Sequence, residues 1–205
     1  MPRLPYETRE PNAPKGLVEM NAVLDCIRDR RSVRSYKPDA VADSELQAVL
    51  EAALYAPSAA NQQPWHFTVI RSREVLDAMN RDTKEHFKSS EVPHFRRFAE
   101  SEQFNVFHNA PLAIIVSGDE RAMLPAVDCA AATENILIAA ESLGLASCWI
   151  NAAIHLFQGA KAAEWLGRLG IPEGFRPMYA VTLGYAAGEK GQAPARKGNN
   201  ITYVD

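Results

Sequence analysis

The sequence predicts a single α+β domain, of mixed α/β type, in which helices flank a central mixed sheet. Patterns typical of helices and of strands are interspersed along the 205 residues, without the strict alternation of a doubly wound sheet. Apolar residues make up 47% of the chain, which is enough to fill one sizeable core. No internal repeat or low-complexity segment divides the sequence. We therefore expect one domain over residues 17–205.

The helices are predicted from apolar residues at helical spacing and from residues that favour helix ends. Asp43 or Ser44 can cap the second helix, which has to end before Pro57, and Ser72 can cap the third. The longest helix is apolar on nearly every side, which predicts burial in a core or an interface, and Gly144 follows it as a C-terminal cap. The predicted helices cover residues 20–27, 43–54, 72–79, 127–143 and 160–169.

Four strands are predicted, and the C-terminus suggests another. Residues 65–70 alternate apolar and polar side chains, as a strand with one buried face does. Residues 112–117 form a continuous apolar run, which predicts burial on both faces and a central place in the sheet. Two further strands are expected over residues 145–150 and 178–183. Alternation over residues 201–204 suggests a terminal strand.

Two segments outside these elements carry expectations of their own. Residues 1–16 alternate prolines with charges and lack an apolar core, so we expect an extended N-terminal arm and no signal peptide. Residues 80–109 scatter five phenylalanines and three histidines among charges, which predicts a partly helical lid that shapes substrate choice. We expect most of these phenylalanines to fill the groove under the lid, although their rings could stack on an aromatic substrate. The histidines share no metal spacing.

Charge and cysteine content exclude several classes of protein. The formal net charge is −3, from 22 basic and 25 acidic side chains, so neither nucleic acid nor an acidic membrane is an expected partner. No stretch approaches the length needed to span a bilayer. The three cysteines have neither the spacing of a zinc site nor that of a disulfide framework. We therefore expect reduced thiols, no bound metal and a cytoplasmic location.

Three polar segments remain as candidate binding sites, since the usual nucleotide, hydrolase and zinc-protease motifs are absent. The basic segment (residues 30–34) offers guanidinium groups and a hydroxyl to a phosphate, or else it is a helix end that faces water. The polar loop (residues 57–65) offers uncharged donors and acceptors to the edge of a heterocycle, or else it is a turn before a strand. The strand-end segment (residues 147–151) is the third candidate, or a plain core strand.

In order and spacing, these segments resemble the nitroreductase superfamily. The resemblance rests on Arg-Arg-Ser-Val-Arg at 30–34, Pro-Ser-Ala-Ala-Asn-Gln-Gln-Pro-Trp at 57–65, Gly-Leu-Ala-Ser-Cys-Trp-Ile at 144–150 and Leu-Gly-Tyr at 183–185. It extends from about residue 17 to the C-terminus. The sequence departs from the family where a proline often follows Gly-Tyr, because two alanines stand there.

The resemblance implies a bound FMN, a domain-swapped homodimer and an active site at each subunit interface, with a C-terminal extension that reaches the partner subunit. Arg30 and Ser32 match phosphate contacts, and Arg196 matches a basic residue that returns to the phosphate. Arg34 matches the cation near the flavin N1 and O2 atoms. The polar loop matches one that reaches the flavin from the other subunit. The implied cofactor-binding residues are Arg30, Arg31, Ser32, Arg34, Pro57, Ser58, Ala59, Asn61, Trp149, Ile150, Asn151 and Arg196.

The resemblance also implies an NAD(P)H-dependent FMN oxidoreductase. Flavin N5 would accept a hydride from the nicotinamide and pass it to a nitroaromatic, a quinone or a similar small acceptor in a ping-pong reaction, without a catalytic acid or base from the protein. Arg34 would stabilise the anionic reduced flavin. Other reactions of the same fold stay open, namely reductive dehalogenation, dehydrogenation and flavin breakdown. A flavin-binding redox module without turnover and a structural dimer without cofactor are the alternatives from other classes.

Overall fold

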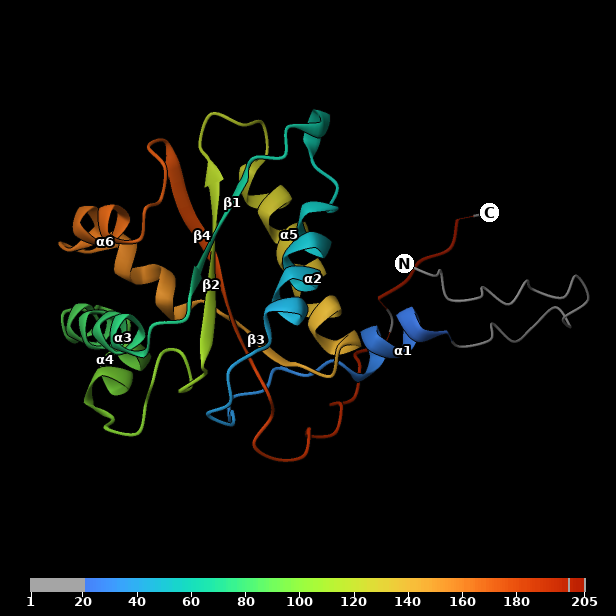
Figure 1. Cartoon of the computed structure of the whole chain (residues 1–205), viewed down its shortest axis with the longest axis horizontal. Coiled ribbons are helices and arrows are strands. Elements are labelled where there is room, and N and C mark those ends of the chain that lie inside the picture. The colour runs from blue at the N-terminus through green and yellow to red at the C-terminus, as the bar shows by residue number, and fades with distance from the viewer. Residues whose placement is uncertain (1–20, 199, 205) are drawn as a thin grey trace, which may run out of the picture.

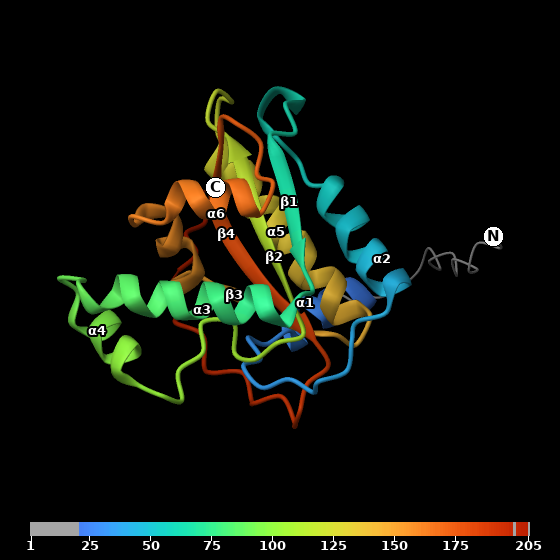
Figure 2. The same ribbon diagram turned by 60° about the vertical axis from the view of Figure 1, so that its left-hand side comes forward.

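The computed structural model describes residues 21–198 and 200–204, and the predicted N-terminal arm lies outside these ranges. A four-stranded sheet forms the centre of the molecule (Figure 1). Helices cover both of its faces, which Figure 2 shows from a second direction. The predicted α+β class is confirmed.

The sheet is antiparallel throughout the described part of the chain. Its strands follow the order β1-β2-β4-β3, and each neighbouring pair is antiparallel. The four strands contain no parallel pair, so the expected mixed sheet is antiparallel among its strands: β4 separates β2 from β3, and β2 separates β1 from β4. The strands are β1 (Trp65–Ile70), β2 (Leu112–Asp119), β3 (Ala146–Ile150) and β4 (Phe175–Gly184).

The predicted helices are present, with differences at their ends. The helix after Ser72 continues to Lys88, because Thr83 and Phe87 extend the buried face beyond Met79. No helix in the described residues is long and apolar enough to cross a membrane. The helices are α1 (Ala22–Asp29), α2 (Asp43–Leu54), η1 (Ala59–Asn61), α3 (Arg73–Lys88), α4 (Pro93–Glu100), α5 (Pro125–Ser142), η2 (Ala152–Gln158) and α6 (Ala162–Arg168).

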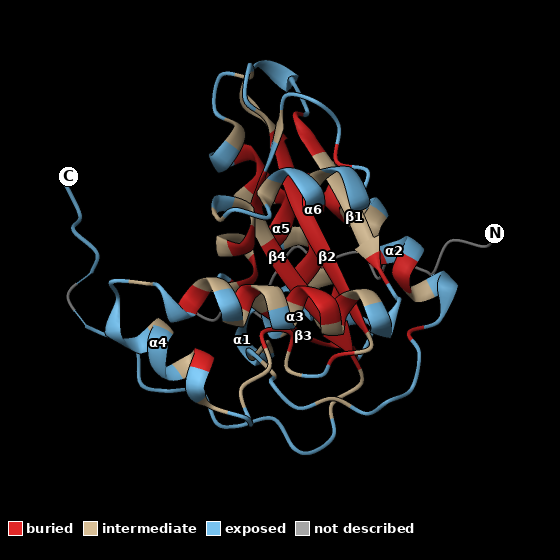
Figure 3. Ribbon diagram, turned by 90° about the vertical axis from the view of Figure 1, so that its left-hand side faces the viewer, coloured by how far each residue is buried: buried red, intermediate tan, exposed pale blue. Residues whose placement is uncertain are grey.

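Two hydrophobic layers lie on the two faces of the sheet. One is formed with α2 and α5, and includes Val49 and Ile136. The other is formed with α3, η2 and α6, and includes Met79 and Trp165. The sheet between them is the most deeply buried part of the fold (Figure 3). All residues of β2 except Asp119 are buried, as predicted for a central strand.

The C-terminal residues differ from the prediction. Residues 200–204 have no regular structure, and Tyr203 is 83% exposed. The predicted terminal strand is therefore absent from this part of the described chain. A strand needs a neighbour to pair its backbone groups, and these residues have none within the described chain.

Candidate active site

The basic segment (residues 30–34) follows α1 and lies where β3 begins and β4 ends. Ser32 forms an isolated parallel bridge with Ser147, and the Val33 N–H donates to the Ser147 carbonyl over 2.9 Å. Farther along, Tyr36 forms an antiparallel bridge with Ala186. The segment is thus attached to this end of the sheet by its own backbone.

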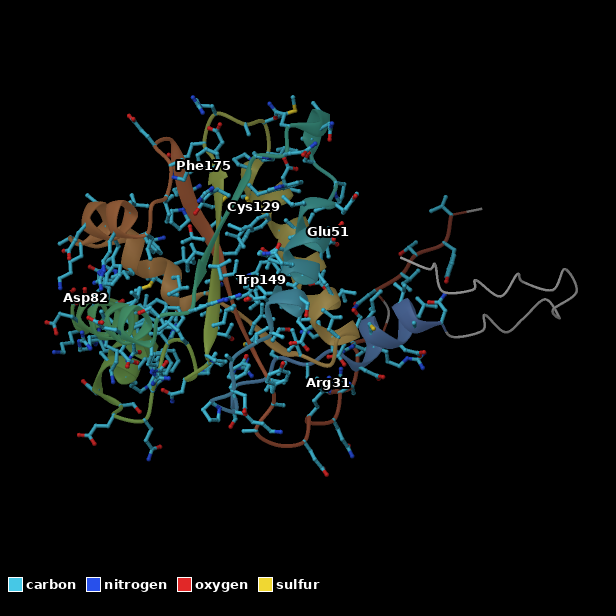
Figure 4. The ribbon with its side chains drawn as sticks, viewed as in Figure 1. Arg31, Glu51, Asp82, Cys129, Trp149 and Phe175 are labelled. Carbon is cyan, nitrogen blue, oxygen red and sulfur yellow. The ribbon has the colours of Figure 1, made fainter. Side chains whose placement is uncertain are left out.

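The side chains of the basic segment have different roles. Arg31 Nη1 donates to the carbonyls of Arg28 and Arg30, over 2.6 and 2.7 Å. Cationic side chains commonly satisfy the last carbonyls of a helix in this way. Arg31 therefore caps the end of α1, at the lower end of the molecule in Figure 4. Its Nε is buried without a partner among the described residues.

The Cys148 thiol marks the point where the other polar side chains meet. Burial raises the pKa of this thiol, and Arg34, a hydrogen bond with Ser32 and the charge of Arg30 oppose that rise. Three residues of the basic segment therefore act electrostatically on one buried sulfur of β3. The structure places Arg30, Ser32 and Arg34 at this end of β3.

Tyr36 links the basic segment to the sheet by hydrogen bonds. Its hydroxyl donates to the Val33 carbonyl over 2.7 Å and lies 2.8 Å from Thr182 Oγ1. Thr182 in turn donates to the Cys148 carbonyl over 3.3 Å. Burial raises the pKa of Tyr36 far above its usual value, so the phenol stays protonated. The hydrogen bonds connect the basic segment with β4 and β3.

Two hollows open at this end of the sheet, and Arg34 lines both. The first has a volume of about 380 Å³ and lies between residues 31–35 and residues 187–191. The second has a volume of about 190 Å³, and its lining includes the strand-end residues Trp149, Ile150 and Asn151. The first offers hydroxyls and guanidinium groups, whereas the second has mainly aromatic and aliphatic walls.

The lid closes the second hollow with two of its phenylalanines. Phe98 and Phe104 line the hollow, and their rings stack with centroids 4.3 Å apart and planes at 4°. Phe87 and Phe95 stack on each other at 4.4 Å, and Phe107 is buried. Phe87 and Phe107 thus pack inside the fold, half-buried Phe95 stacks on Phe87, and Phe98 and Phe104 face the hollow.

The polar loop (residues 57–65) has a strained backbone and is held by a hydrogen bond to a buried carboxylate. Ala60, Asn61 and Gln63 have φ of 49°, 54° and 47°, values that are uncommon without glycine and that mark functional sites. The Ala59 N–H donates over 3.0 Å to Asp128, a buried carboxylate at the start of α5. The other oxygen of that carboxylate has no partner among the described residues.

The polar loop and the basic segment lie at opposite ends of one subunit. The loop adjoins β1 where Gly118 pairs with Arg176, whereas the basic segment adjoins Ser147, which pairs with Leu183. Along β4 these positions are roughly 23 Å apart, at about 3.3 Å per residue. Figure 1 shows η1 at the upper end of the sheet, and Figure 4 shows Phe175 there and Arg31 at the other end. The predicted residues therefore form two groups.

Arg196 joins neither group. It lies in the exposed C-terminal segment, and its Nη1 donates to the Pro194 carbonyl over 3.4 Å. It is not among the residues that line either hollow. Its predicted contact with a phosphate stays a prediction.

Sequence reasoning missed two residues that the structure places in these groups. The sequence assigned His108 no role beyond its lack of metal spacing, and it lines the second hollow together with Arg34. Asp128 lies within a stretch predicted as an apolar helix, and its carboxylate accepts a hydrogen bond from the Ala59 N–H of the polar loop. An acidic residue on the buried face of an apolar helix was the signal for Asp128, whereas no signal distinguished His108.

Comparison with known proteins identifies the family. The family model described as "Nitroreductase family" matches residues 27–185. The chain belongs to the nitroreductase family. This nitroreductase-family chain is 37% identical, over 83% of its length and 89% of the other, to an Archaeoglobus fulgidus protein provisionally named NADH dehydrogenase/NAD(P)H nitroreductase.

Solved structures of nitroreductases show the same fold. A nitroreductase with bound FMN from Bacteroides fragilis is 37% identical, with a TM-score of 0.85 over 91% of this chain and 100% of the other. A nitroreductase with bound FMN from Desulfitobacterium hafniense is 33% identical, with a TM-score of 0.83 over the same shares. The family and fold expected from the resemblance are confirmed.

Proposed function

We propose that this member of the nitroreductase family is an NAD(P)H-dependent FMN oxidoreductase that reduces nitroaromatic, quinone or related small acceptors. Similar proteins are solved with FMN bound and named for NAD(P)H-dependent reduction. One observation carries the proposal for this chain: Arg34 lines both an anion-suited hollow and an aromatic hollow. A flavin nucleotide has one group of each kind.

The donor set fits FMN. The first hollow offers the Ser32 hydroxyl and guanidinium groups, which bind phosphate by charge-assisted hydrogen bonds. Trp149, Ile150 and Asn151 line the second hollow, where a planar ring can contact apolar and amide groups. Arg34 between them suits the N1 and O2 atoms, where negative charge develops on reduction. Ser32 and Arg34 line the first hollow and would hold the cofactor. Arg31 also lines it while it caps α1, and Arg30, which lines neither hollow, stays a predicted phosphate contact.

The complete site requires a second copy of the chain. Pro57, Ser58, Ala59 and Asn61 lie far from the basic segment of their own subunit, so in a homodimer the polar loop reaches the site of the partner. The surface supports this assembly, because α1 has no buried residue and exposes Val23 and Ile27 by 62% and 54%. Tyr55, next to the polar loop, is 80% exposed. Apolar surface of this kind marks an interaction site.

The protein's residues contribute binding and electrostatics to the reaction. When bound, the flavin supplies hydride acceptance and donation at N5. Arg34 would stabilise the negative charge that develops on the reduced ring system, and the lid phenylalanines would exclude water from the second hollow. Reductant and acceptor would meet the same exposed face of the flavin in turn, which gives ping-pong kinetics. Binding of both ligands over one flavin would contradict this order.

The site of action is the cytoplasm. All three cysteines are free thiols, and Cys129 and Cys148 are buried. Disulfides form mainly in oxidising compartments, so free thiols are typical of a reducing one. Expression of the untagged protein followed by cell fractionation tests this part of the proposal.

The first test is the visible spectrum of the purified protein, followed by heat release and chromatographic identification of the chromophore. We expect about one FMN per subunit and bleaching when NADH or NADPH is added under nitrogen. Reoxidation by a nitroaromatic or quinone distinguishes an enzyme from a redox module without turnover. A colourless protein that takes up no added FMN would overturn the proposal.

A further inference from the structure

Arg34 depends on its backbone for the position of its charge. Its guanidinium makes one hydrogen bond among the described residues, to the Ser32 carbonyl over 3.4 Å, which is longer than the usual distance between a nitrogen donor and an oxygen acceptor. Because the side chain is long and weakly held, it follows any rotation of the peptide groups on either side of its Cα atom. The groups that fix those peptides therefore determine where the cation lies.

Two hydrogen bonds fix Val33, the residue before Arg34. The Val33 N–H donates to the Ser147 carbonyl over 2.9 Å. The Val33 carbonyl, which belongs to the peptide group that joins Val33 to Arg34, accepts the Tyr36 hydroxyl over 2.7 Å. The first bond joins two backbone groups and persists when a side chain is changed. The Tyr36 hydroxyl is therefore the group that a substitution can remove.

The position of Tyr36 is itself fixed by β4 and the residues after it. The Tyr36 hydroxyl lies 2.8 Å from Oγ1 of Thr182, a fully buried residue. The Tyr36 ring lies against Gly184, where an added Cβ atom would be 3.0 Å from Tyr36 Cδ1. The Tyr36 backbone forms an antiparallel bridge with Ala186. The phenol thus connects the rigid sheet to the peptide group before Arg34.

We propose that Tyr36 is a positioning residue that holds Arg34 beside the flavin, and that it thereby makes the site favour reduced over oxidised FMN. The inference rests on the proposed function and names a residue that tunes it. Negative charge develops on the ring system when the flavin is reduced, so a well-placed cation stabilises the reduced form more than the oxidised form. The reduction potential of the bound flavin rises by the same difference in free energy.

The test measures the dissociation constants of reduced and oxidised FMN in Tyr36→Phe, which loses the hydroxyl and keeps the ring. Oxidised FMN is titrated in air and chemically reduced FMN under nitrogen, so the measurement needs no turnover. We expect the ratio of the reduced to the oxidised constant to rise about tenfold, which lowers the potential of a two-electron couple by about 30 mV.

Tyr185→Phe is the matched control for the loss of a tyrosine hydroxyl. Tyr185 is half-buried like Tyr36 and directly follows β4, but its hydroxyl donates to Glu45 of α2 over 2.6 Å. We expect an unchanged ratio in this variant. Equal changes in Tyr36→Phe and Tyr185→Phe would overturn the inference, because a general loss of stability would then explain both.

A double variant tests whether Tyr36 acts through Arg34. Arg34→Ala removes the group that Tyr36 positions, so adding Tyr36→Phe should then change the ratio by less than about twofold. The titrations extend to high FMN concentration, because Arg34→Ala is expected to bind the cofactor weakly. The same tenfold change with and without Arg34 would show that Tyr36 acts independently, and would overturn the inference.

Thr182 provides a second pair of variants in case Tyr36→Phe does not fold. Thr182→Val removes the hydroxyl beside the Tyr36 hydroxyl and keeps the branched shape, whereas Thr182→Ser keeps the hydroxyl. We expect the ratio to rise about threefold in Thr182→Val and to keep its natural value in Thr182→Ser. Where Tyr36→Phe does not fold, equal ratios in these two variants would overturn the inference.

The outcomes separate this inference from the proposed function. A natural protein that reduces nitroaromatic or quinone acceptors, with an unchanged ratio in Tyr36→Phe, would keep the proposed function and overturn the inference. A shifted ratio in a protein that binds FMN and reduces no acceptor would support the inference and reject the proposed enzyme. A protein that binds no FMN would overturn both.

Discussion

The two ends of the sheet differ in how much of the proposed cofactor site a single chain provides there. At the end with the basic segment, backbone bridges and the Tyr36 hydroxyl fix the backbone and place Arg34 between two hollows. At the end with the polar loop, three non-glycine residues keep a left-handed backbone and a buried oxygen of Asp128 lacks a partner. One end holds, within a single chain, residues proposed to bind FMN. The other is a strained loop that, under the proposed function, acts in the site of a second subunit.

The largest expected effect tests whether the second subunit is needed. Ile27→Asp places a charge on the exposed apolar side of α1, which contributes no buried residue to its own subunit. We expect a folded monomer that binds FMN at least about 100-fold more weakly, because each site loses the partner's loop. Light scattering and a fluorescence titration measure both properties. Glu164→Lys, at an exposed position of α6, should stay dimeric, and a dimeric Ile27→Asp protein would remove α1 from the interface.

Loss of Arg34 tests the end that one chain completes. Arg34→Ala removes the cation shared by the two hollows. Hydrogen bonds to charged groups contribute about 1.5–3 kcal/mol, so FMN should bind roughly 10- to 150-fold more weakly while the dimer persists. Arg168→Ala removes an exposed arginine of α6 that lies over the Trp165 ring, away from both the basic segment and the polar loop, and should leave FMN affinity unchanged. Equal losses in both variants would indicate a non-specific effect of charge.

Asp128→Ala tests the support of the polar loop. The substitution leaves the Ala59 N–H without its acceptor, and an unsatisfied buried group costs about 1–3 kcal/mol. We expect faster hydrogen exchange confined to residues 57–64 and about tenfold weaker FMN binding. Thr133→Val, which removes a hydroxyl bonded to Cys129 within α5, is the control. Unchanged exchange at the loop in Asp128→Ala would show that the carboxylate does not hold it.

The smallest effect concerns the lid between the two ends. Burial lowers the pKa of His155, and the charges of His86 and His94 add to this, against a hydrogen bond with Gln158. A histidine whose pKa is lowered in the folded state stabilises the fold at pH values above its pKa in the unfolded chain. This contribution is lost as the pH falls through the pKa of the folded state. The free energy of unfolding should therefore fall below about pH 6.5, and less in His155→Gln. Urea titrations at several pH values measure the difference.

The sequence predicted individual helices and strands better than it predicted which distant segments lie together in the fold. Periodicity located β2 and α5 because burial repeats along a strand or a helix. It could not show that the last strand, β4, lies between β2 and β3, which made the sheet antiparallel. The same limit applies to the site. Arginines in the basic segment look alike in sequence, and only the fold shows that Arg31 binds helix carbonyls while Arg34 reaches two hollows.

The resemblance to a family supplied what periodicity could not. It predicted that the basic segment and the strand-end segment share a site, and the structure places Arg34 and Trp149 on one hollow. It gave no information on His108 or Asp128, because these residues lie outside the motifs that carry the resemblance. Their roles depend on neighbours from β3, the basic segment and the polar loop, which only a folded chain brings together.

The position of β4 has a consequence for biosynthesis. Residues 175–184 are synthesised after both β2 and β3, yet they pair with each of these strands. Until β4 is present, β2 and β3 each have an edge whose backbone groups lack the partner that β4 provides. The residues that follow the basic segment also bond to residues made later: the Lys37 N–H donates to the Tyr185 carbonyl, and the Ala187 N–H donates to the Ser35 carbonyl. A nascent chain thus completes its sheet and the backbone contacts beside its basic segment together, once residues 175–187 have been made, and the unpaired edges need protection before that.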